Sequence, residues 1–326
     1  MGAIVARAPL RVALGGGGTD LPSYYREHGG FVVSTAIDRY VHIVATDRFQ
    51  DRYRLKHLEW EEVDEPGEVR HPILREALAA HWDRGPIELA SVADAPPGTG
   101  LGSSGAYAVC AIKALRLLAG VDLSPAELAE EASHLEIELL GRSIGKQDQY
   151  AASFGGARAY TFLPDDSVEV RELELSEDVR RALRDDFLLF FTGRERSASD
   201  VLSGQVVGNA RIQRALDRLR ELAYDATAVL EAGDLARYAE LMGEHWEAKR
   251  ERAPGTVTED MGDLRRRALR GGARGVISLG AGGGGFLLVY SPEPERTRAA
   301  LDGVPELRFE PEERGATALT PAALET

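Results

Sequence analysis

The sequence predicts a globular fold that combines β-strands with α-helices. Apolar residues alternate along residues 3–14, 40–46 and 87–92, which is the two-residue period of a strand. Residues 210–231 and 235–250 have the length and the apolar spacing of helices. The length of 326 residues, with 44% hydrophobic and 28% charged residues, suits one large domain or two domains of ordinary size.

Composition narrows the class of protein. The net charge of −14 argues against a nucleic-acid-binding protein, because such proteins carry a basic surface. No segment has the length of a membrane span, since Lys113 and Arg116 interrupt the most apolar helix. The single cysteine, Cys110, cannot form an intrachain disulfide, so we expect a small core residue in a reducing cytoplasm.

The remaining elements follow from local signals. Residues 125–140 are predicted to form a helix, because Ser124 can cap its N-terminus and Glu127 completes a capping box. We expect the tail from Thr317 onward to be loosely ordered. The other predicted strands are residues 31–36, 52–57, 157–162, 168–173 and 187–191, with one strand on each side of a glycine loop in 275–290, and the other predicted helices are residues 21–27, 73–81, 106–118 and 258–270.

A glycine-rich loop at residues 95–105 joins the predicted strand 87–92 to the predicted helix 106–118. Glycine lets the backbone approach a ligand closely and adopt a positive φ. The free N–H groups at a helix start, together with the helix dipole, bind anions. The sequence therefore predicts a phosphate-binding loop, and the alternative is an ordinary glycine turn in which a serine caps the helix.

Two common phosphate-binding motifs do not describe this chain. Residues 100–105 fit the letters of a dinucleotide-binding loop, but Pro96 and Pro97 separate them from the preceding strand. Such loops usually lie in the first βαβ unit, whereas this one comes well into the chain. Residues 141–147 have three residues between the glycines and a glutamine after the lysine, so they do not form a P-loop.

A second glycine segment, residues 15–20, follows the first predicted strand and ends at Asp20. Four consecutive glycines make a tight turn at which the backbone can approach a ligand. The alternative is a turn in which Asp20 caps the helix predicted at residues 21–27.

Three segments resemble the signatures of the GHMP kinases, the family of galactokinase, homoserine kinase and mevalonate kinase. Pro97 followed by Gly100-Leu-Gly-Ser-Ser104 resembles the second signature. Residues 8–20 (APLRVALGGGGTD) resemble the first, and the glycine loop within residues 275–290 resembles the third. The three occur in the expected order, and within the family they are most similar to sugar 1-kinases that act on D-glycero-D-manno-heptose 7-phosphate.

The resemblance implies a fold of the α+β class with two domains. Residues 1–185 would form an N-terminal domain with a left-handed βαβ crossover, and residues 186–326 would form a ferredoxin-like domain. ATP, Mg²⁺ and a sugar phosphate would meet in the cleft between them. No nucleic acid or membrane is implied as a partner, the location would be cytoplasmic, and a homodimer is left open.

The resemblance also implies roles for individual residues. Asp148 would be the catalytic acid-base group, and Arg11 would lie near the reacting centre. Glu136, preferred over Glu138, would bind Mg²⁺ together with Ser103 or Ser104. The implied ATP phosphate site comprises Pro97, Gly98, Gly100, Leu101, Gly102, Ser103, Ser104 and Gly105; the sugar site Gly17, Gly18, Thr19, Asp20 and Asp148; and the third glycine loop Gly280, Ala281, Gly282, Gly283 and Gly284.

The phosphate of the substrate requires cations or N–H donors outside the nucleotide loops. Three candidates follow from patterns shared with the heptose kinases: Arg194 and Arg196, which follow Thr192-Gly193, and Lys249, which stands three residues after Trp246. For Lys249 the alternative is an ordinary surface lysine.

The implied reaction is ATP-dependent phosphorylation of the anomeric hydroxyl of D-glycero-D-manno-heptose 7-phosphate, which gives the 1,7-bisphosphate. One alternative is a 1-kinase for a free sugar such as L-fucose or L-arabinose. Another is a catalytically silent sugar-binding protein, which the presence of Asp148 and Glu136 disfavours. A third is a dinucleotide-dependent oxidoreductase, which rests on residues 100–105 alone.

Overall fold

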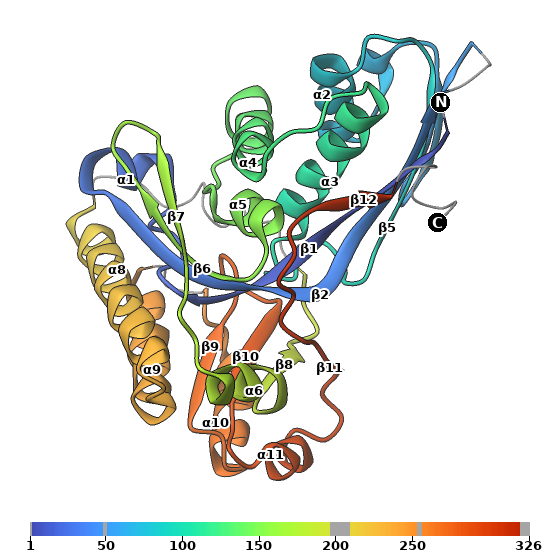
Figure 1. The fold of residues 1–326 in the computed structure, drawn as a ribbon. Coiled ribbons are helices and arrows are strands. Elements are labelled where there is room, and N and C mark those ends of the chain that lie inside the picture. Colours follow the sequence, from blue (N-terminus) through green and yellow to red (C-terminus); the bar gives the residue numbers. More distant parts are fainter. Residues whose placement is uncertain (1, 48–50, 196–208, 253–255, 320–326) are drawn as a thin grey trace.

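The computed structural model describes residues 2–47, 51–195, 209–252 and 256–319, so Arg196 lies outside the described residues. A large sheet carries helices on one face and a second, smaller α and β unit on the other (Figure 1). The strands are β1 (Ile4–Gly15), β2 (Gly30–Asp47), β3 (Tyr53–Lys56), β4 (Trp60–Val63), β5 (Ile87–Ala93), β6 (Ala157–Phe162), β7 (Val168–Glu172), β8 (Phe187–Phe191), β9 (Gly275–Ser278), β10 (Phe286–Tyr290), β11 (Glu306–Leu307) and β12 (Thr317–Leu319).

The larger sheet has eight strands. Its main order is β12-β1-β2-β5-β3-β4, and β6 and β7 extend from β2. The pair β3–β5 is parallel, and the other pairs in this sheet are antiparallel. β1 is buried along most of its length because both of its faces are covered. α3 packs on β1 and β2 from one side, and α8 packs on the same strands from the other (Figure 1).

The helices fall into two groups. The helices that precede β6 are α1 (Pro22–His28), α2 (Pro72–His81), α3 (Ser103–Leu118), α4 (Pro125–His134) and α5 (Gln147–Phe154). The same part of the chain has a 3₁₀ turn at Pro66–Glu68 and a π-helical turn at Leu135–Leu139. Those that follow are α6 (Glu177–Asp185), α8 (Ala210–Glu231), α9 (Leu235–Arg252), α10 (Glu259–Arg270) and α11 (Pro294–Ala300).

The smaller sheet is antiparallel, with the order β11-β8-β10-β9. β10 is buried along its whole length, as its apolar sequence requires. α9 packs on β9 and α8 packs on α9, so the two long helices join this sheet to the larger one. Leu10 of β1, Leu219 of α8 and Leu288 of β10 belong to one continuous apolar core, which fixes the two units against each other.

The structure confirms most of the expected elements and corrects several details. The capping box of α4 forms between Ser124 and Glu127, and Cys110 is fully buried. The two strands expected at 31–36 and 40–46 are one strand, β2, because its register shifts where it passes Pro9 and the pairing with β1 then continues. The helix expected through residue 140 changes to a π-helical turn at Leu135–Leu139.

The C-terminal end of the chain returns to the first sheet. The first three residues of the tail expected to be loose, Thr317–Leu319, form β12 and pair with β1, and residues 320–326 lie outside the described residues. Short alternating segments gain order when an open strand edge offers partners for their backbone, and the edge of β1 does this. Pro311 and residues 317–319 therefore pair with strands of the N-terminal sheet, although they follow the expected boundary at 185/186.

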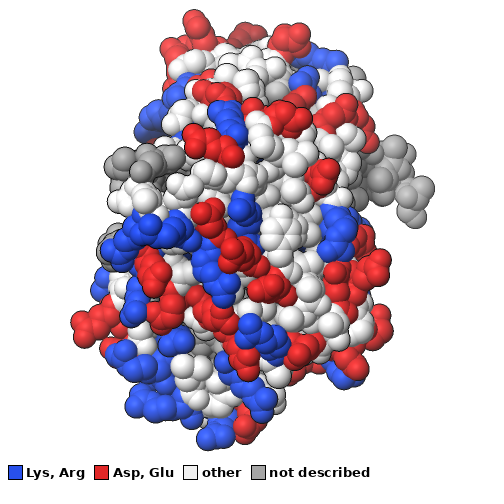
Figure 2. Space-filling model, turned by 90° about the vertical axis from the view of Figure 1, so that its left-hand side faces the viewer, with Lys and Arg blue, Asp and Glu red and all other residues white. Residues whose placement is uncertain are grey.

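The surface mixes charges of both signs. Figure 2 shows lysine and arginine interspersed with aspartate and glutamate over the face in view, with no continuous basic area. None of the helices in the described part of the chain combines the length and hydropathy needed to cross a membrane.

Candidate active site

Three glycine loops meet around a cavity of about 350 Å³. They are the loop between β1 and α1, the loop between β5 and α3, and the loop between β9 and β10. The segment between the π-helical turn and α5, and one face of α9, complete the lining. The cavity therefore draws on both sheets, which places any ligand between the two units.

The loop before α3 presents a helix N-terminus to this cavity. Gly98, Gly100 and Gly102 all have positive φ values, and Gly102, at φ 77°, is the residue from which α3 begins. Ser103 and Ser104 open a helix of 16 residues, so its free N–H groups and its dipole face the cavity. This geometry fits an anion such as a phosphate.

The second and third glycine loops are in backbone contact. A Cβ on Gly100 would lie 2.8 Å from the carbonyl oxygen of Leu279, and one on Gly280 would lie 2.6 Å from the Cα of Gly100. Only glycine permits this approach. The contact explains why glycines from segments far apart in the sequence occur at one site.

Arg11 and Asp148 form a salt bridge at the cavity. Arg11 Nε donates to Asp148 Oδ1 at 2.9 Å, and an Nη atom lies 2.6 Å from the same oxygen. Arg11 is buried on β1, whereas the Asp148 side chain, in the first turn of α5, is 30% exposed toward the cavity. The arginine therefore fixes the carboxylate while leaving it able to meet a ligand.

Asp148 is positioned by the crossing of α5 and α3. A Cβ on Gly105 would lie 2.6 Å from the Cβ of Asp148 and 3.0 Å from the backbone nitrogen of Gln149. Gly105 therefore allows the first turn of α5 to lie directly on the first turn of α3. The carboxylate is held beside the anion-binding N-terminus of α3.

Asp20 is buried and accepts hydrogen bonds from two backbone segments. Gly18 N donates to its Oδ1 at 3.0 Å, and Gln147 N donates to its Oδ2 at 3.1 Å. Burial, and then the charge of Asp148, raise the pKa of Asp20 above its usual range. The N-cap alternative is wrong, because α1 begins after Leu21 with no side-chain cap.

Glu136 is fully buried beside Ser104. Ser104 Oγ donates to Glu136 Oε1 at 2.5 Å, and Gln149 Nε2 donates to Oε2 at 2.7 Å. Burial raises the pKa of Glu136, and the hydrogen bond from Ser104 and the charge of Arg142 oppose that rise. Glu138, by contrast, is half exposed and faces Arg26.

The oxygens of Ser104 and Glu136 already attract a cation. Arg142 Nη1 lies 2.7 Å from Glu136 Oε1 and 2.8 Å from Ser104 Oγ. A hydroxyl and a carboxylate are hard oxygen donors, so the pair fits Mg²⁺, which takes few protein ligands and keeps waters and phosphate oxygens. The described residues contain no cluster of three or more acidic, histidine or cysteine side chains that would form an all-protein site.

The three residues that were candidates for binding the substrate phosphate differ in their position relative to the cavity. The surface alternative for Lys249 is wrong, since the residue is 5% exposed and lines the cavity. Arg194 instead pairs with Asp260 at 2.6 Å on the surface, and it does not line the cavity. Arg196 lies outside the described residues.

Some residues of the glycine signatures support the loops and do not face the cavity. Thr19 is fully buried and its hydroxyl donates to the carbonyls of Gly16 and Phe31. Leu101 is buried, and its carbonyl accepts from Arg11 N. Gly283 is absent from the lining of the cavity.

Sequence reasoning missed several residues of the cavity. Arg142 lies in the segment that was considered only as a P-loop, and His245 and Arg252 share one face of α9 with Lys249. Gln147 also lines the cavity, with a buried Nε2 that has no partner among the described residues. The spacing of residues 245, 249 and 252 is a helical signal that could have indicated the α9 group.

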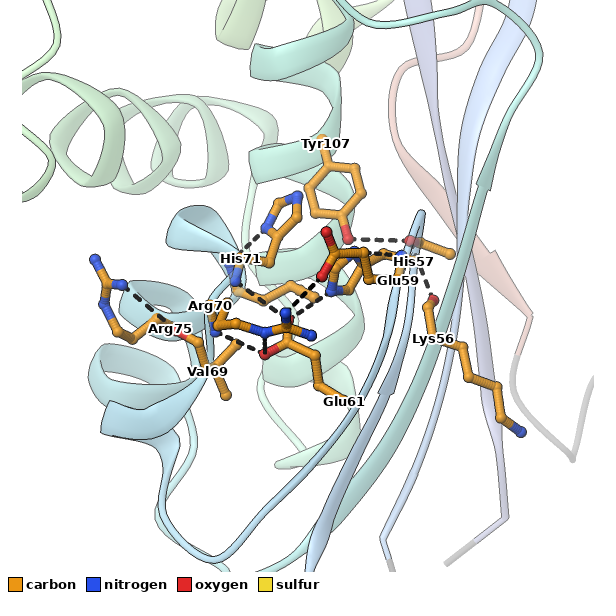
Figure 3. A network of polar contacts seen from close by, with 11 residues as sticks. Lys56, His57, Glu59, Glu61, Val69, Arg70, His71, Arg75 and Tyr107 are labelled. Atoms are coloured by element: carbon orange, nitrogen blue, oxygen red, sulfur yellow. Dashed lines mark hydrogen bonds and ion pairs between the residues drawn. The ribbon is translucent and has the colours of Figure 1, made fainter.

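A second polar network lies outside the cavity, where β3 and β4 approach α2 (Figure 3). Glu61 is buried and contacts His57 Nε2 at 2.6 Å, and it accepts from the backbone nitrogen of Arg70 at 2.7 Å. His71 accepts from Leu74 N at the start of α2, and burial lowers its pKa to about 4. This network anchors the segment before α2.

The fold and the cavity together define a class of protein. A phosphate-type helix N-terminus, an oriented carboxylate and a pair of hard oxygen donors are the parts that phosphoryl transfer requires. Residues 71–156, which include the helix N-terminus, Glu136 and Asp148, match the family described as GHMP kinases N terminal domain. The chain is therefore related to the GHMP kinases, and its two-unit α+β fold is the GHMP kinase fold.

Individual relatives extend this match over nearly the whole chain. The D-glycero-alpha-D-manno-heptose 7-phosphate kinase of Campylobacter jejuni subsp. jejuni serotype O:2 is 28% identical over 305 residues, which are 89% of this chain and 90% of that protein. The bifunctional fucokinase/GDP-fucose pyrophosphorylase of Arabidopsis thaliana is 26% identical over 89% of this chain, which corresponds to 30% of that longer protein.

Among solved structures, a D-glycero-D-manno-heptose 1-phosphate kinase from Bacteriodes thetaiotaomicron has the same fold. It superposes with a TM-score of 0.78 at 24% identity, over 97% of this chain and 99% of that chain.

Proposed function

We propose that the protein is an ATP-dependent sugar kinase that phosphorylates the anomeric hydroxyl of D-glycero-D-manno-heptose 7-phosphate. The observation that carries the proposal is the Arg11–Asp148 pair held beside the N-terminus of α3 within one cavity. The 28% identical heptose 7-phosphate kinase, aligned over 89% of this chain, supports the choice of substrate.

Asp148 would accept the proton of the attacking hydroxyl. A carboxylate is a weak base for an alcohol, but the loose transition state of phosphoryl transfer requires proton removal late. Its first task is therefore to orient the hydroxyl, and the contact with Arg11 Nε at 2.9 Å holds it for that task. Arg11 would also stabilise negative charge that develops during the transfer.

The phosphates of ATP would bind at the loop 97–105 and the first turn of α3. The N–H groups there are free of helical partners, and no lysine is needed to attract the anion. Ser104 and Glu136 would hold Mg²⁺, which neutralises phosphate charge when bound. Arg142, which contacts both residues, would then be free to meet a phosphate oxygen.

The sugar would lie against the loop 17–20 and the start of α5. Asp20 is anchored by two N–H groups, so its carboxylate can accept from sugar hydroxyls without changing position. Gln147 supplies a buried amide that has no partner among the described residues. These groups would place the anomeric hydroxyl between Asp148 and the nucleotide phosphates.

ATP consumption across a sugar panel tests the proposal. The panel contains heptose 7-phosphate, heptose 1-phosphate, free heptose, L-fucose and L-arabinose, with NMR of each product. Both heptose monophosphates would yield the 1,7-bisphosphate, so the substrate that is consumed, and not the product, distinguishes them. Preferred turnover of the 7-phosphate is the expected result.

A free-sugar 1-kinase is the second candidate, supported by the 26% identity to the fucokinase-containing protein. Faster turnover of L-fucose or L-arabinose would establish it in place of the heptose phosphate. The absence of turnover with every sugar would instead favour a sugar-binding protein without catalysis.

A further inference from the structure

One face of α9 brings three basic side chains to the cavity. His245, Lys249 and Arg252 are spaced by four and three residues, so they are neighbours on the helix surface. Their exposures are 8%, 5% and 3%, and all three line the cavity. We call these three residues the α9 cluster.

Two of these residues are held in place by backbone carbonyls. Lys249 Nζ donates to the carbonyls of Ser278 and Gly280, at 2.7 and 2.6 Å. Arg252 Nη1 donates to the carbonyl of Gly17 at 2.9 Å. The cluster therefore spans from the third glycine loop to the first, and it is rigid before any ligand binds.

The cluster keeps unused hydrogen-bonding capacity. His245 Nδ1 and Arg252 Nε are buried and have no hydrogen-bond partner within the described residues. Ser278 Oγ, which also lines the cavity, is in the same state. Buried polar groups normally have partners, so these unpartnered groups around one cavity are available to a polar ligand.

The cluster has few acidic neighbours, although the charge of Asp20 opposes the effect of burial on the pKa of Arg252. Over the described ranges of the chain, no carboxylate forms an ion pair with Lys249 or Arg252. On the face shown in Figure 2, by contrast, lysine and arginine side chains lie next to aspartate and glutamate side chains. Buried cations are rarely left unpaired. This protein has a net charge of −14, so acidic residues that could pair with the cluster are more numerous in the sequence than basic ones.

The shifted pKa values of the three side chains indicate the charge of a ligand that would stabilise their protonated forms. Burial, followed by repulsion from Arg252 and Arg11, lowers the pKa of Lys249 far below its usual range. Burial lowers the pKa of Arg252 to about 10 and that of His245 to about 3. An anion placed between them would favour the charged forms that burial opposes.

The cluster reaches two sides of the cavity, since Lys249 lies at the third glycine loop, beside Gly100, and Arg252 lies at the first glycine loop. Arg252 touches the loop that carries Asp20, and the guanidinium lies so close to Gly18 that a Cβ there would clash at 1.8 Å. Ser104 and Glu136, with their own basic partner Arg142, lie at the N-terminus of α3. The Arg252 end of the α9 cluster therefore lies beside the part of the cavity assigned to the acceptor sugar.

We infer that the α9 cluster is a phosphate-monoester subsite for the acceptor, so that the protein selects a phosphorylated sugar over a free one. This inference rests on the proposed sugar kinase function and identifies the residues that decide its substrate class. Two fixed cationic groups, the imidazole of His245 and a serine hydroxyl suit the three oxygens of a phosphate monoester.

The experiment measures binding without turnover. Isothermal titration gives Kd for heptose 7-phosphate, free heptose and Mg·AMP-PNP, each alone, with wild type, Lys249→Met, Lys249→Arg and Arg252→Met. Lys113→Met is the matched control, because Lys113 pairs with Asp122 away from the cavity lining. Thermal unfolding of every variant accompanies the titrations, and if Lys249→Met does not fold, Arg252→Met decides.

We expect Lys249→Met and Arg252→Met to raise Kd for heptose 7-phosphate by roughly tenfold to a hundredfold, the worth of one charge-assisted hydrogen bond. Lys249→Arg should recover part of this loss, and Lys113→Met should match wild type. The Kd values for free heptose and Mg·AMP-PNP should change much less than that for heptose 7-phosphate, since neither ligand brings a phosphate monoester to the cluster.

Three results would overturn the inference. Equal weakening of free and phosphorylated heptose would show that the cluster only supports the loops, and a loss confined to Mg·AMP-PNP would assign it to the nucleotide. Wild-type affinity for heptose 7-phosphate in both charge-removing variants would exclude any phosphate contact. Selective loss of heptose 7-phosphate binding in a protein that turns over no sugar would uphold the subsite and refute the kinase proposal.

Discussion

The contact between Gly105 and the first turn of α5 can be tested by adding one methyl group. A Cβ at Gly105 would lie 2.6 Å from the Cβ of Asp148, whereas ordinary contacts begin at about 3.4 Å, so α5 must move by about 0.8 Å. Overpacking of this kind costs roughly 1–3 kcal/mol. A glycine-to-alanine change within a helix otherwise stabilises by roughly 0.5–1 kcal/mol, so Gly105→Ala should reverse the usual sign.

Gly243→Ala is the matched control, because Gly243 lies within α9 and the nearest atom to its Cβ would be 4.0 Å away. We expect Gly105→Ala to lower the midpoint of thermal unfolding and Gly243→Ala to raise it slightly. Displacement of Asp148 from Arg11 should also reduce kcat by about tenfold to a hundredfold. Wild-type stability together with wild-type kcat in Gly105→Ala would refute the claim that this glycine positions the carboxylate.

Three further changes test the assigned roles. Asp148→Asn should lower kcat by about a hundredfold or more while calorimetry finds unchanged ATP binding, because Asn keeps the shape but loses the proton acceptor; a nearly normal kcat would remove Asp148 from the mechanism. Glu136→Gln should raise the Mg²⁺ concentration needed for half-maximal activity, and Glu138→Gln should not, because Glu138 is half exposed beside Arg26; the opposite pattern would reassign the ligand. The folded-state pKa of Asp20 is raised, so wild type carries the cost of a buried carboxylate above that pKa and loses the cost as pH falls through it toward 3.8. The unfolding midpoint of wild type minus that of Asp20→Asn should therefore increase between pH 7 and pH 5, and a decrease would contradict the burial argument.

Much of the fold could be predicted because its signals are local. The capping box of Ser124 and Glu127, the glycine turn before α3 and the apolar strand β10 all depend on residues close in sequence. The continuity of β2 could not be predicted, because the bulge at Pro9 depends on the register with β1. β12 could not be predicted either, because a segment of three residues forms a strand only when it pairs with β1.

The candidate site likewise contains residues that the sequence could indicate and residues that it could not. The glycine loops and the order of Arg11, Glu136 and Asp148 are visible in the sequence, so a family resemblance could indicate them. Arg142 could not be identified, because its contact with Ser104 joins residues 38 positions apart. The burial of Lys249 depends on how α9 docks on β9, and no spacing within the helix states which face is covered.

The pairing of the last strand with the first has a consequence for biosynthesis. β1 is synthesised long before β12, so its outer edge stays unpaired, and Tyr40 lacks its carboxylate partner Glu312, until residues 312–319 have been made. A nascent chain that ends near residue 185 therefore carries an open sheet edge, which is a site for pairing with other chains. Completion of the N-terminal sheet thus requires residues 317–319, and a division of the chain at the boundary between its two sheets would remove a strand from that sheet.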